Sequence, residues 1–350
     1  DPTGVKTPGG TGVKPTKPNQ FLQRLSELTG ADIAASANPI GNAALGGDWE
    51  LEVQIGSIET PIPFNANALK TYNGVLGLAP QVTFLTGTRP FYLSIGDING
   101  DGKPDLATAN NTNTSNTASI LLNTTPTGTT TPTLATKVDF PTGISPESVS
   151  IGDINGDGKP DLATANRNSN TASILLNTTA TGAATPTFAT QVTFLTGPQP
   201  ISVSIGDFNG DGKPDLAVAN YNSTVSILLN TTPTGATPPT FDPQVTFATG
   251  ADSEVVSIDD LNGDGKSDLA VVNARSANVS VLLNTTLTGA TTPTFTSQVS
   301  FPTGTLPRSV SIGDLNGDGK PDLAVANSGS NTASILLNTT ATGVITPTFA

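Results

Sequence analysis

The chain contains no cysteine and no histidine among its 350 residues. Without cysteine it can form no disulfide and offers no thiolate, and without histidine it has neither a Ser-His nor a Cys-His catalytic pair. The two absences also remove the usual ligands of a zinc site. A glycine-rich phosphate loop of the required spacing is missing as well. The sequence therefore predicts a protein that is not an enzyme.

Charge and apolar runs are also scarce. Charged residues make up 12% of the chain, which is about half the usual share. No basic stripe or aromatic platform for nucleic acid is present, and no apolar run approaches the roughly 20 residues of a membrane span. We expect no nucleic-acid partner and no membrane span. No signal-peptide pattern is visible, and we interpret residue 1 as the start of a fragment or processed chain.

What the chain does have is a nonapeptide, Asp-x-Asn-Gly-Asp-Gly-x-x-Asp, that occurs five times. A Phe-x-Thr-Gly begins 13 residues before each copy, and an Asn lies 13 residues after its first Asp. A Leu-Leu-Asn-Thr-Thr follows in every repeat, after a stretch of variable length that indicates a solvent-exposed loop. The five repeats span about 80–134, 135–188, 189–241, 242–295 and 296–350.

Each repeat contains four short strand-like segments. In the second repeat we expect strands at 148–151, 161–165, 172–176 and 188–194, because these segments are rich in β-branched residues and bounded by Gly, Pro, Asn and Asp. Four strands in a repeat of about 40–55 residues are typical of a propeller blade. A serine recurs in the first strand, where a small side chain would let blades converge on the axis. The sequence predicts an all-β fold, a β-propeller of five four-stranded blades over residues 79–350.

The region before the repeats differs in composition. Residues 1–19 form a Pro/Gly-rich arm or linker, and residues 20–78 form a small α+β segment. Within it we expect one short helix at 20–29 and two strands inside 48–64.

Each nonapeptide is a predicted calcium site. Ca²⁺ takes about six to eight oxygen ligands. Side-chain oxygens at positions 1, 3, 5 and 9 and the carbonyl at position 7 can wrap the ion, with water completing the shell. The alternative is a plain hairpin turn, but three carboxylates in each of five copies would repel one another without a cation. The predicted ligands are Asp97, Asn99, Asp101, Lys103, Asp105; Asp153, Asn155, Asp157, Lys159, Asp161; Asp207, Asn209, Asp211, Lys213, Asp215; Asp260, Asn262, Asp264, Lys266, Asp268; and Asp314, Asn316, Asp318, Lys320, Asp322.

The net charge agrees with this interpretation. The chain carries a formal charge of −13, and 15 of its 28 acidic residues belong to the nonapeptides. Five Ca²⁺ ions would leave a charge of about −3. The loops are not EF-hands, because position 12 is a threonine or valine in place of the bidentate glutamate.

These motifs carry a family resemblance. The repeats resemble the FG-GAP/VCBS repeats of integrin α-subunit propellers and of many bacterial surface proteins, with Phe-x-Thr-Gly where that family has Phe-Gly. Residues 25–76 resemble the tail of an uncharacterised domain at the front of large secreted cyanobacterial proteins, through the segments 28–36, 43–52 and 56–60. The resemblances imply calcium-binding blades in a secreted or cell-surface protein.

The order of strands assigns loops to faces. We expect the calcium loops and the Asn-Thr-Thr segments on one face, and the variable loops at 110–116, 221–223 and 275–278 on the other. The variable loops are candidates for partner contact; the alternative is that they are plain solvent loops. Asn-x-Ser/Thr sequons predict turn chemistry, with glycosylation as the alternative; they lie at Asn123, Asn177, Asn230, Asn284, Asn338, Asn110, Asn113, Asn222 and Asn278.

Our leading hypothesis is a structural subunit that self-associates into an extracellular fibre or tube. The arm 1–19 would add a strand to a neighbour's free sheet edge. The alternatives are an adhesion or carbohydrate-binding propeller and the substrate-positioning part of a larger enzyme. Within one chain, we expect residues 79–84 to supply the fourth strand of the last blade and close the ring.

Overall fold

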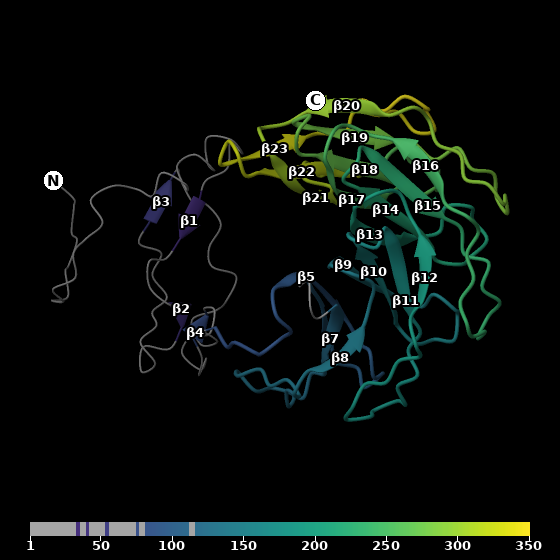
Figure 1. Ribbon diagram of the computed structural model, residues 1–350. Helices are drawn as coiled ribbons and strands as arrows, with labels where there is room; N and C mark the ends of the chain where they lie inside the picture. The colour runs from purple at the N-terminus through teal and green to yellow at the C-terminus, as the bar shows by residue number, and fades with distance from the viewer. Residues whose placement is uncertain (1–32, 36–39, 42–52, 56–74, 77–80, 112–115) are drawn as a thin grey trace, which may run out of the picture. The chain divides into compact units, whose positions relative to one another are not determined.

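The computed structural model describes residues 33–35, 40–41, 53–55, 75–76, 81–111 and 116–350 (Figure 1). The chain divides into two compact units, residues 1–81 and 82–350. In the first unit, β1 (Ile33–Ala35) pairs antiparallel with β3 (Val53–Ile55), and β2 (Ile40–Gly41) with β4 (Val75–Leu76). A strand predicted within 48–64 is thus confirmed at β3. The arm 1–19, the helix at 20–29 and the rest of 48–64 lie outside the described residues.

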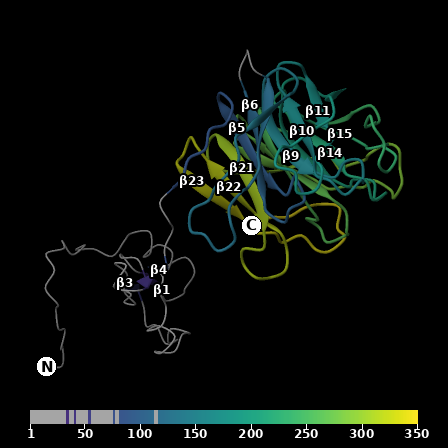
Figure 2. The same cartoon turned by 90° about the horizontal axis from the view of Figure 1, so that it is seen from below.

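The second unit is a series of five antiparallel sheets, one for each repeat (Figures 1 and 2). Four sheets have four strands and the last has three. The strands are, in blade 1, β5 (Pro90–Gly96), β6 (Asp105–Asn110), β7 (Thr117–Leu121) and β8 (Val138–Pro141); in blade 2, β9 (Pro146–Gly152), β10 (Asp161–Asn166), β11 (Thr171–Leu175) and β12 (Val192–Leu195); in blade 3, β13 (Pro200–Gly206), β14 (Asp215–Asn220), β15 (Thr224–Leu228) and β16 (Val245–Ala248); in blade 4, β17 (Ser253–Asp259), β18 (Asp268–Asn273), β19 (Asn278–Leu282) and β20 (Val299–Pro302); and in blade 5, β21 (Pro307–Gly313), β22 (Asp322–Asn327) and β23 (Thr332–Leu336).

The fourth strand is shorter than predicted. The segment expected at 188–194 begins with a single bridge between Phe188 and Asn177, and the regular strand β12 starts only at Val192. Three residues lie between Phe188 and Val192, whereas two lie between their partners Asn177 and Ile174. The extra residue is a β-bulge, which interrupts the ladder and turns the strand.

The first strands of neighbouring blades lie together around a common axis (Figure 1). The recurring serine predicted for this position links them. The hydroxyl of Ser94 donates to the carbonyl of Val149 at 2.6 Å, and that of Ser150 donates to the carbonyl of Val203 at 2.6 Å. A larger side chain would keep the strands apart, so the small residue fixes how closely the blades converge.

The apolar core lies between blades and not within a single one. Ile174 and Leu176 of blade 2 pack with Val203 and Leu228 of blade 3, and all four side chains are buried. Similar clusters join every other neighbouring pair of blades. Because burying one such aliphatic side chain contributes about 1.5–3 kcal/mol, each blade depends on its neighbours for stability.

Among the described residues, the series of blades does not close. The sheet of blade 5 has three described strands, and of residues 79–84, predicted to be its fourth, the described residues 81–84 form no strand with any described residue. Figure 1 shows an opening between β5 and β23. Apolar side chains stand exposed on both sides of it: Ile335 is 49% exposed where its counterpart Ile174 is 0%, and Leu93 is 47% exposed where Val149 is 0%. The predicted closure within one chain is therefore wrong for this structure, because blades 5 and 1 are not neighbours.

Candidate metal centres

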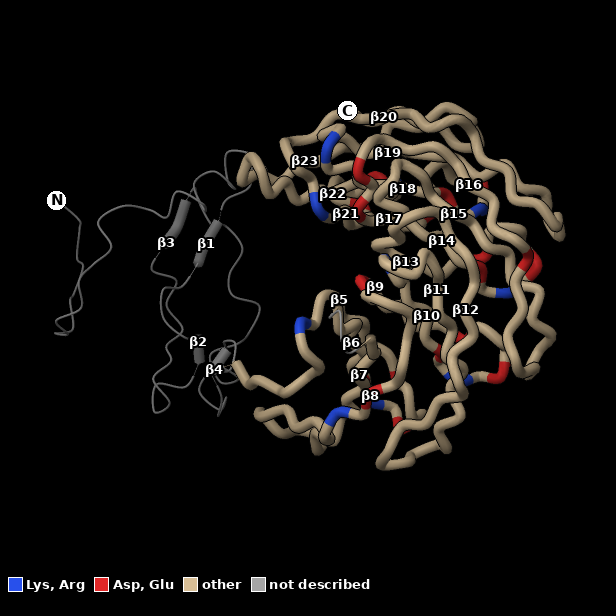
Figure 3. Tube along the Cα trace, in the orientation of Figure 1, with Lys and Arg blue, Asp and Glu red and all other residues tan. Residues whose placement is uncertain are grey.

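The five acidic nonapeptides form the turns between the first and second strands of the blades, as predicted. In blade 1 the loop runs from Asp97, just after β5, to Asp105, the first residue of β6. Gly100 and Gly102 adopt φ of 66° and 83°. A side chain at Gly102 would meet no neighbour, so glycine is needed there for the left-handed backbone and not for space. Acidic residues recur from blade to blade in Figure 3.

The side chains at positions 1, 3 and 5 turn inward onto the loop's own backbone. In blade 1 the carboxylate of Asp97 accepts bonds from the amides of Asp101 at 3.0 Å and Gly102 at 2.8 Å. Asn99 Oδ1 accepts a further bond from Asp101, and Asp101 accepts one from Lys103 at 2.9 Å. The same contacts recur in the other four loops. The side-chain oxygens are therefore gathered at one turn by the backbone.

Position 9 has a second task that the sequence did not reveal. In blade 2 the side chain of Asp161 is fully buried, and its carboxylate accepts bonds from the amides of Ile154 at 2.8 Å and Asn177 at 2.7 Å. A third amide, that of Asn155, lies at 3.3 Å. Asp161 thus ties the loop to the end of the third strand. Equivalent bonds hold Asp105, Asp215, Asp268 and Asp322.

Burial of this carboxylate has an electrostatic consequence. Desolvation raises the pKa of Asp161, Asp215 and Asp268 to about 7 from an ordinary 3.8, although their backbone hydrogen bonds act in the opposite direction. The negative charges at positions 1 and 5 of the loops add to the rise at Asp215 and Asp268. A cation in the loop would lower the pKa of the position-9 carboxyl again, because a nearby positive charge favours the ionised carboxylate.

The donor set suits a hard cation. Each loop supplies carboxylate and amide oxygens, the ligands that Ca²⁺ takes, and each carboxylate has lone pairs beyond those used by the backbone. In the described part of the chain, no three acidic side chains converge closely enough to hold an ion as they stand. The structure brings positions 1, 3, 5 and 9 of each nonapeptide to one turn, but it points them at backbone amides. The carbonyl at position 7, predicted as a ligand, takes part in none of these bonds.

Position 3 carries a further role missed by the sequence. Asn99 is buried, and its Nδ2 donates to the carbonyl of Ala183 in blade 2 at 3.1 Å, while its backbone carbonyl accepts from Gly182 at 2.7 Å. The loops of blades 3 and 4 make the same two contacts with the following blade. The candidate metal loops of blades 1–4 are therefore also inter-blade joints.

The Asn-Thr-Thr asparagines lie beside these loops, which confirms the predicted face. Asn177 is buried, and its Nδ2 donates to the carbonyls of Ile98 at 2.8 Å and Pro160 at 3.0 Å. A buried side-chain amide that donates to two carbonyls has no room for a glycan, which supports the turn-chemistry interpretation of this sequon. Asn230 and Asn338 are held in the same way, and Asn284 Nδ2 donates to the carbonyl of Phe208 at 2.9 Å.

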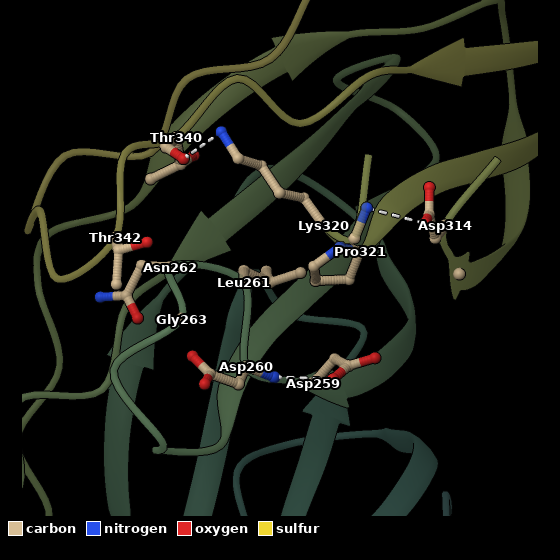
Figure 4. Close-up of a pocket in the computed structure, with 12 residues that line it drawn as sticks. Asp259, Asp260, Leu261, Asn262, Gly263, Asp314, Lys320, Pro321, Thr340 and Thr342 are labelled. Atoms are coloured by element: carbon tan, nitrogen blue, oxygen red, sulfur yellow. Dashed lines mark hydrogen bonds between the residues drawn. The ribbon is translucent and has the colours of Figure 1, made fainter. Parts of the chain in front are cut away.

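A cavity of about 420 Å³ separates two neighbouring loops, those of blades 4 and 5 (Figure 4). Asp259 and Asp260 lie on one side of it, and Asp314 lies on the other. Lys320 extends along the cavity, and its Nζ donates to the carbonyl of Thr340 at 2.9 Å. Blades 1, 2, 3 and 5 have a glycine where blade 4 has Asp259, so this pocket is more acidic than its counterparts.

The variable loops gather at the opposite end of the blades, as predicted. Backbone bonds join the turn after β10 to the connection before β9, and the turn after β14 to the connection before β13. Here the guanidinium of Arg167 lies 5.2 Å from the ring centre of Tyr221, whose hydroxyl donates to Asp252 at 3.0 Å. Residues 112–115 of the first variable loop lie outside the described residues.

The chain is thus a tandem-repeat protein, in which each repeat forms one blade with an acidic loop between its first two strands. The FG-GAP-like repeat family matches residues 97–164, 153–218, 207–271 and 260–325, and the FG-GAP repeat matches 306–346. The chain belongs to the FG-GAP-like repeat family. Residues 13–76 match a domain of unknown function, DUF4347. Both resemblances inferred from the sequence are thereby confirmed.

Solved structures with similar backbones share little sequence. A protein from Lactobacillus plantarum is 17% identical over 80% of this chain and 73% of its own, with a TM-score of 0.48. A putative 6-phosphogluconolactonase from Bacteroides fragilis is 19% identical over 79% and 86%, with a TM-score of 0.44. At these scores neither likeness bears on activity. No curated protein matches the chain. Among the described residues, no helix has the length and apolarity for a membrane crossing.

Proposed function

We propose that the chain is a non-enzymatic, calcium-binding FG-GAP protein of the cell surface or extracellular matrix. The observation that supports calcium most directly is the buried position-9 aspartate beside an acidic turn, repeated in all five blades. A buried carboxylate near like charges is costly unless a cation is bound. FG-GAP repeats are common in extracellular and surface proteins, where calcium is abundant.

Calcium loading would exchange the amide bonds of positions 1 and 5 for bonds to the ion. Asp97 is half-buried and Asp101 is exposed, so their side chains have room to rotate, whereas the buried Asp105 is held in place. The position-9 carboxylate would then act as the fixed ligand on which the loop closes. Elemental analysis of protein dialysed against calcium, followed by calorimetric titration after chelation, tests this proposal. Fewer than one bound Ca²⁺ per chain would refute it.

We further propose that the protein is a structural subunit that self-associates into a fibre or tube. This is supported by the first and last blades, where among the described residues Leu93 and Ile335 are 47% and 49% exposed at positions that are buried between other blades. Monomeric proteins rarely expose contiguous apolar faces of this kind. Electron microscopy of the purified chain, with calcium and with chelator, tests it: regular polymers are expected with calcium, and a strictly monomeric chain at high concentration would refute it.

A second candidate function is an adhesion or carbohydrate-binding propeller. One feature favours it. At the variable-loop end, Arg167, Tyr221 and Asp252 form an aromatic and charged row, and Arg308 pairs with Glu254 close by. Aromatic faces and charged hydrogen-bonding groups are suited to sugars. A glycan array tests this role, and loss of binding on Tyr221→Ala, with Tyr221→Phe as the matched control, would assign it to this row.

A further inference from the structure

From blade 2 to blade 5, the Asn-Thr-Thr asparagine stands between two candidate metal loops. In blade 3 the backbone amide of Asn230 donates to Asp215 Oδ1, the position-9 carboxylate of its own loop, at 2.7 Å. Its side-chain Nδ2 donates to the carbonyl of Ile154, at position 2 of the loop in blade 2, at 2.7 Å. Its Oδ1 accepts from the amide of Thr232 at 2.9 Å. Asn230 is 1% exposed, so one buried residue contacts both loops.

A further bond completes a path between two buried carboxylates. The amide of Ile154 donates to Asp161 Oδ2, the position-9 carboxylate of blade 2, at 2.8 Å. Asp161 and Asp215 are therefore joined through Ile154 and Asn230 by three hydrogen bonds, none longer than 2.8 Å. Both carboxylates are fully buried, so solvent has no direct access to either end of this path.

The same path recurs between every pair of neighbouring blades. Asn177, Asn284 and Asn338 take the place of Asn230, and Ile98, Phe208 and Leu261 take that of Ile154. All bonds in these paths measure 2.7 to 2.9 Å. The five position-9 carboxylates therefore form one hydrogen-bonded series, which the repeat alone does not show.

Both ends of each path belong to the predicted metal ligands or to the backbone between them. Ile154 lies between Asp153 and Asn155, at positions 1 and 3 of the loop in blade 2. An ion that draws these two side chains together fixes the backbone between them, including the carbonyl of Ile154. That carbonyl holds Asn230, which in turn holds Asp215 in place for an ion in blade 3. The conformational entropy lost at the first site is then not lost again at the second.

We propose that the Asn-Thr-Thr asparagines are positioning residues that couple neighbouring calcium sites, so that an ion in one loop strengthens binding in the next. The inference rests on the proposed calcium binding and names how its sites are regulated. Such coupling is reciprocal, whichever site of a pair fills first. The charge of a bound ion acts in the opposite direction, because it cancels negative charge that attracts the second ion. Salt screens that effect over about 8 Å at 0.15 M, whereas buried hydrogen bonds persist.

Two chains with two sites each test the proposal. Asp97→Ala, Asp260→Ala and Asp314→Ala together leave the sites of blades 2 and 3, which are neighbours. Asp97→Ala, Asp207→Ala and Asp314→Ala leave those of blades 2 and 4, which are separated by an empty loop. Each change removes a position-1 carboxylate and keeps the buried position 9, so both chains should fold alike. Calorimetric titration with calcium after chelation, at 0.15 M salt, yields the two stepwise constants of each chain.

A pair of variants in the neighbouring-site chain assigns the coupling to the asparagine. Asn230→Ala removes the donor to Ile154 and keeps the backbone bond to Asp215. Thr232→Ala is the matched control, because Thr232 is 2% exposed in the same hairpin. Its hydroxyl exchanges bonds of 2.9 and 3.1 Å with the backbone of Thr240 in its own blade. A purely structural effect should appear in both variants, and an effect on coupling only in the first.

In the neighbouring pair, the second ion should bind at least about 5-fold more tightly than the first after statistical correction. In the separated pair, the two ions should bind equally tightly. Asn230→Ala should make the two constants of the neighbouring pair equal, whereas Thr232→Ala should leave their ratio unchanged even where it lowers the melting temperature.

Three results would refute the coupling while calcium binding stands: equal constants in the neighbouring pair, a second ion that binds more weakly than the first, or an unchanged ratio in Asn230→Ala. The comparison of the two pairs needs no asparagine variant, so it decides the outcome even where Asn230→Ala folds poorly. If neither chain binds calcium, the proposed calcium function fails as well.

Discussion

Asp161→Ala should destabilise blade 2 even when no calcium is present. The buried carboxylate accepts two short backbone bonds, from Ile154 and Asn177, and a longer one from Asn155. Removing it leaves at least two buried amides without an acceptor. Each unsatisfied amide costs about 1–3 kcal/mol, so the free energy of unfolding should fall by about 2–6 kcal/mol in excess chelator.

The matched control is Asp157→Ala in the same loop. Asp157 is exposed and accepts a single short bond, from the amide of Lys159 at 2.9 Å. Exposed substitutions of this kind usually change stability by less than about 0.5 kcal/mol, so this variant should be nearly neutral in chelator. With calcium, both variants should lose the metal of blade 2.

Urea unfolding followed by circular dichroism, in chelator and in calcium, measures the two effects separately. A shift of the midpoint at constant slope reports stability. Because neighbouring blades stabilise one another, the transition of an array can broaden, and hydrogen exchange of the β10 amides then locates the loss in blade 2. Equal stability of the two variants in chelator would refute the structural role of position 9.

Three further predictions concern metal, pH and packing. Excess EDTA should lower the melting temperature, since ligand at 100 times its Kd adds about 2.7 kcal/mol per site, and Asp211→Ala should reduce the calcium content by one ion; an unchanged melting curve would contradict this. Without calcium, Asp161, Asp215 and Asp268, with a pKa of about 7, bind more protons in the folded chain than in the unfolded chain. The free energy of unfolding should therefore fall as pH rises from about 4 to 7, and calcium should reverse the sign of this pH dependence. Ile227→Ala, at a fully buried site, should lower the free energy of unfolding by about 2–5 kcal/mol. Ile335→Ala, at the equivalent site in blade 5, which is 49% exposed, should lower it by less than about 1 kcal/mol in the monomer. Equal shifts of the two urea midpoints would show that the face of blade 5 around Ile335 is covered.

The sequence by itself determined the repeat, its strands and its acidic turns. These features are local: a nonapeptide with glycine at position 6 must turn wherever it occurs, and β-branched segments between such turns form strands. The position of the acidic loops relative to the Asn-Thr-Thr segments followed from strand order alone. The bulge before β12 did not, because its extra residue appears only when Phe188 and Val192 are aligned with their partners.

Only the tertiary structure decided how the blades meet. The double role of Asp161, the inter-blade bond of Asn99 and the burial of Asn177 all depend on residues more than a dozen positions away, which a motif does not show. The same holds for closure. Residues 81–87 and 191–197 are identical in sequence, yet only the second copy lies in a sheet. Their difference arises from the neighbour that each one meets, because a strand forms only where another edge offers it hydrogen bonds.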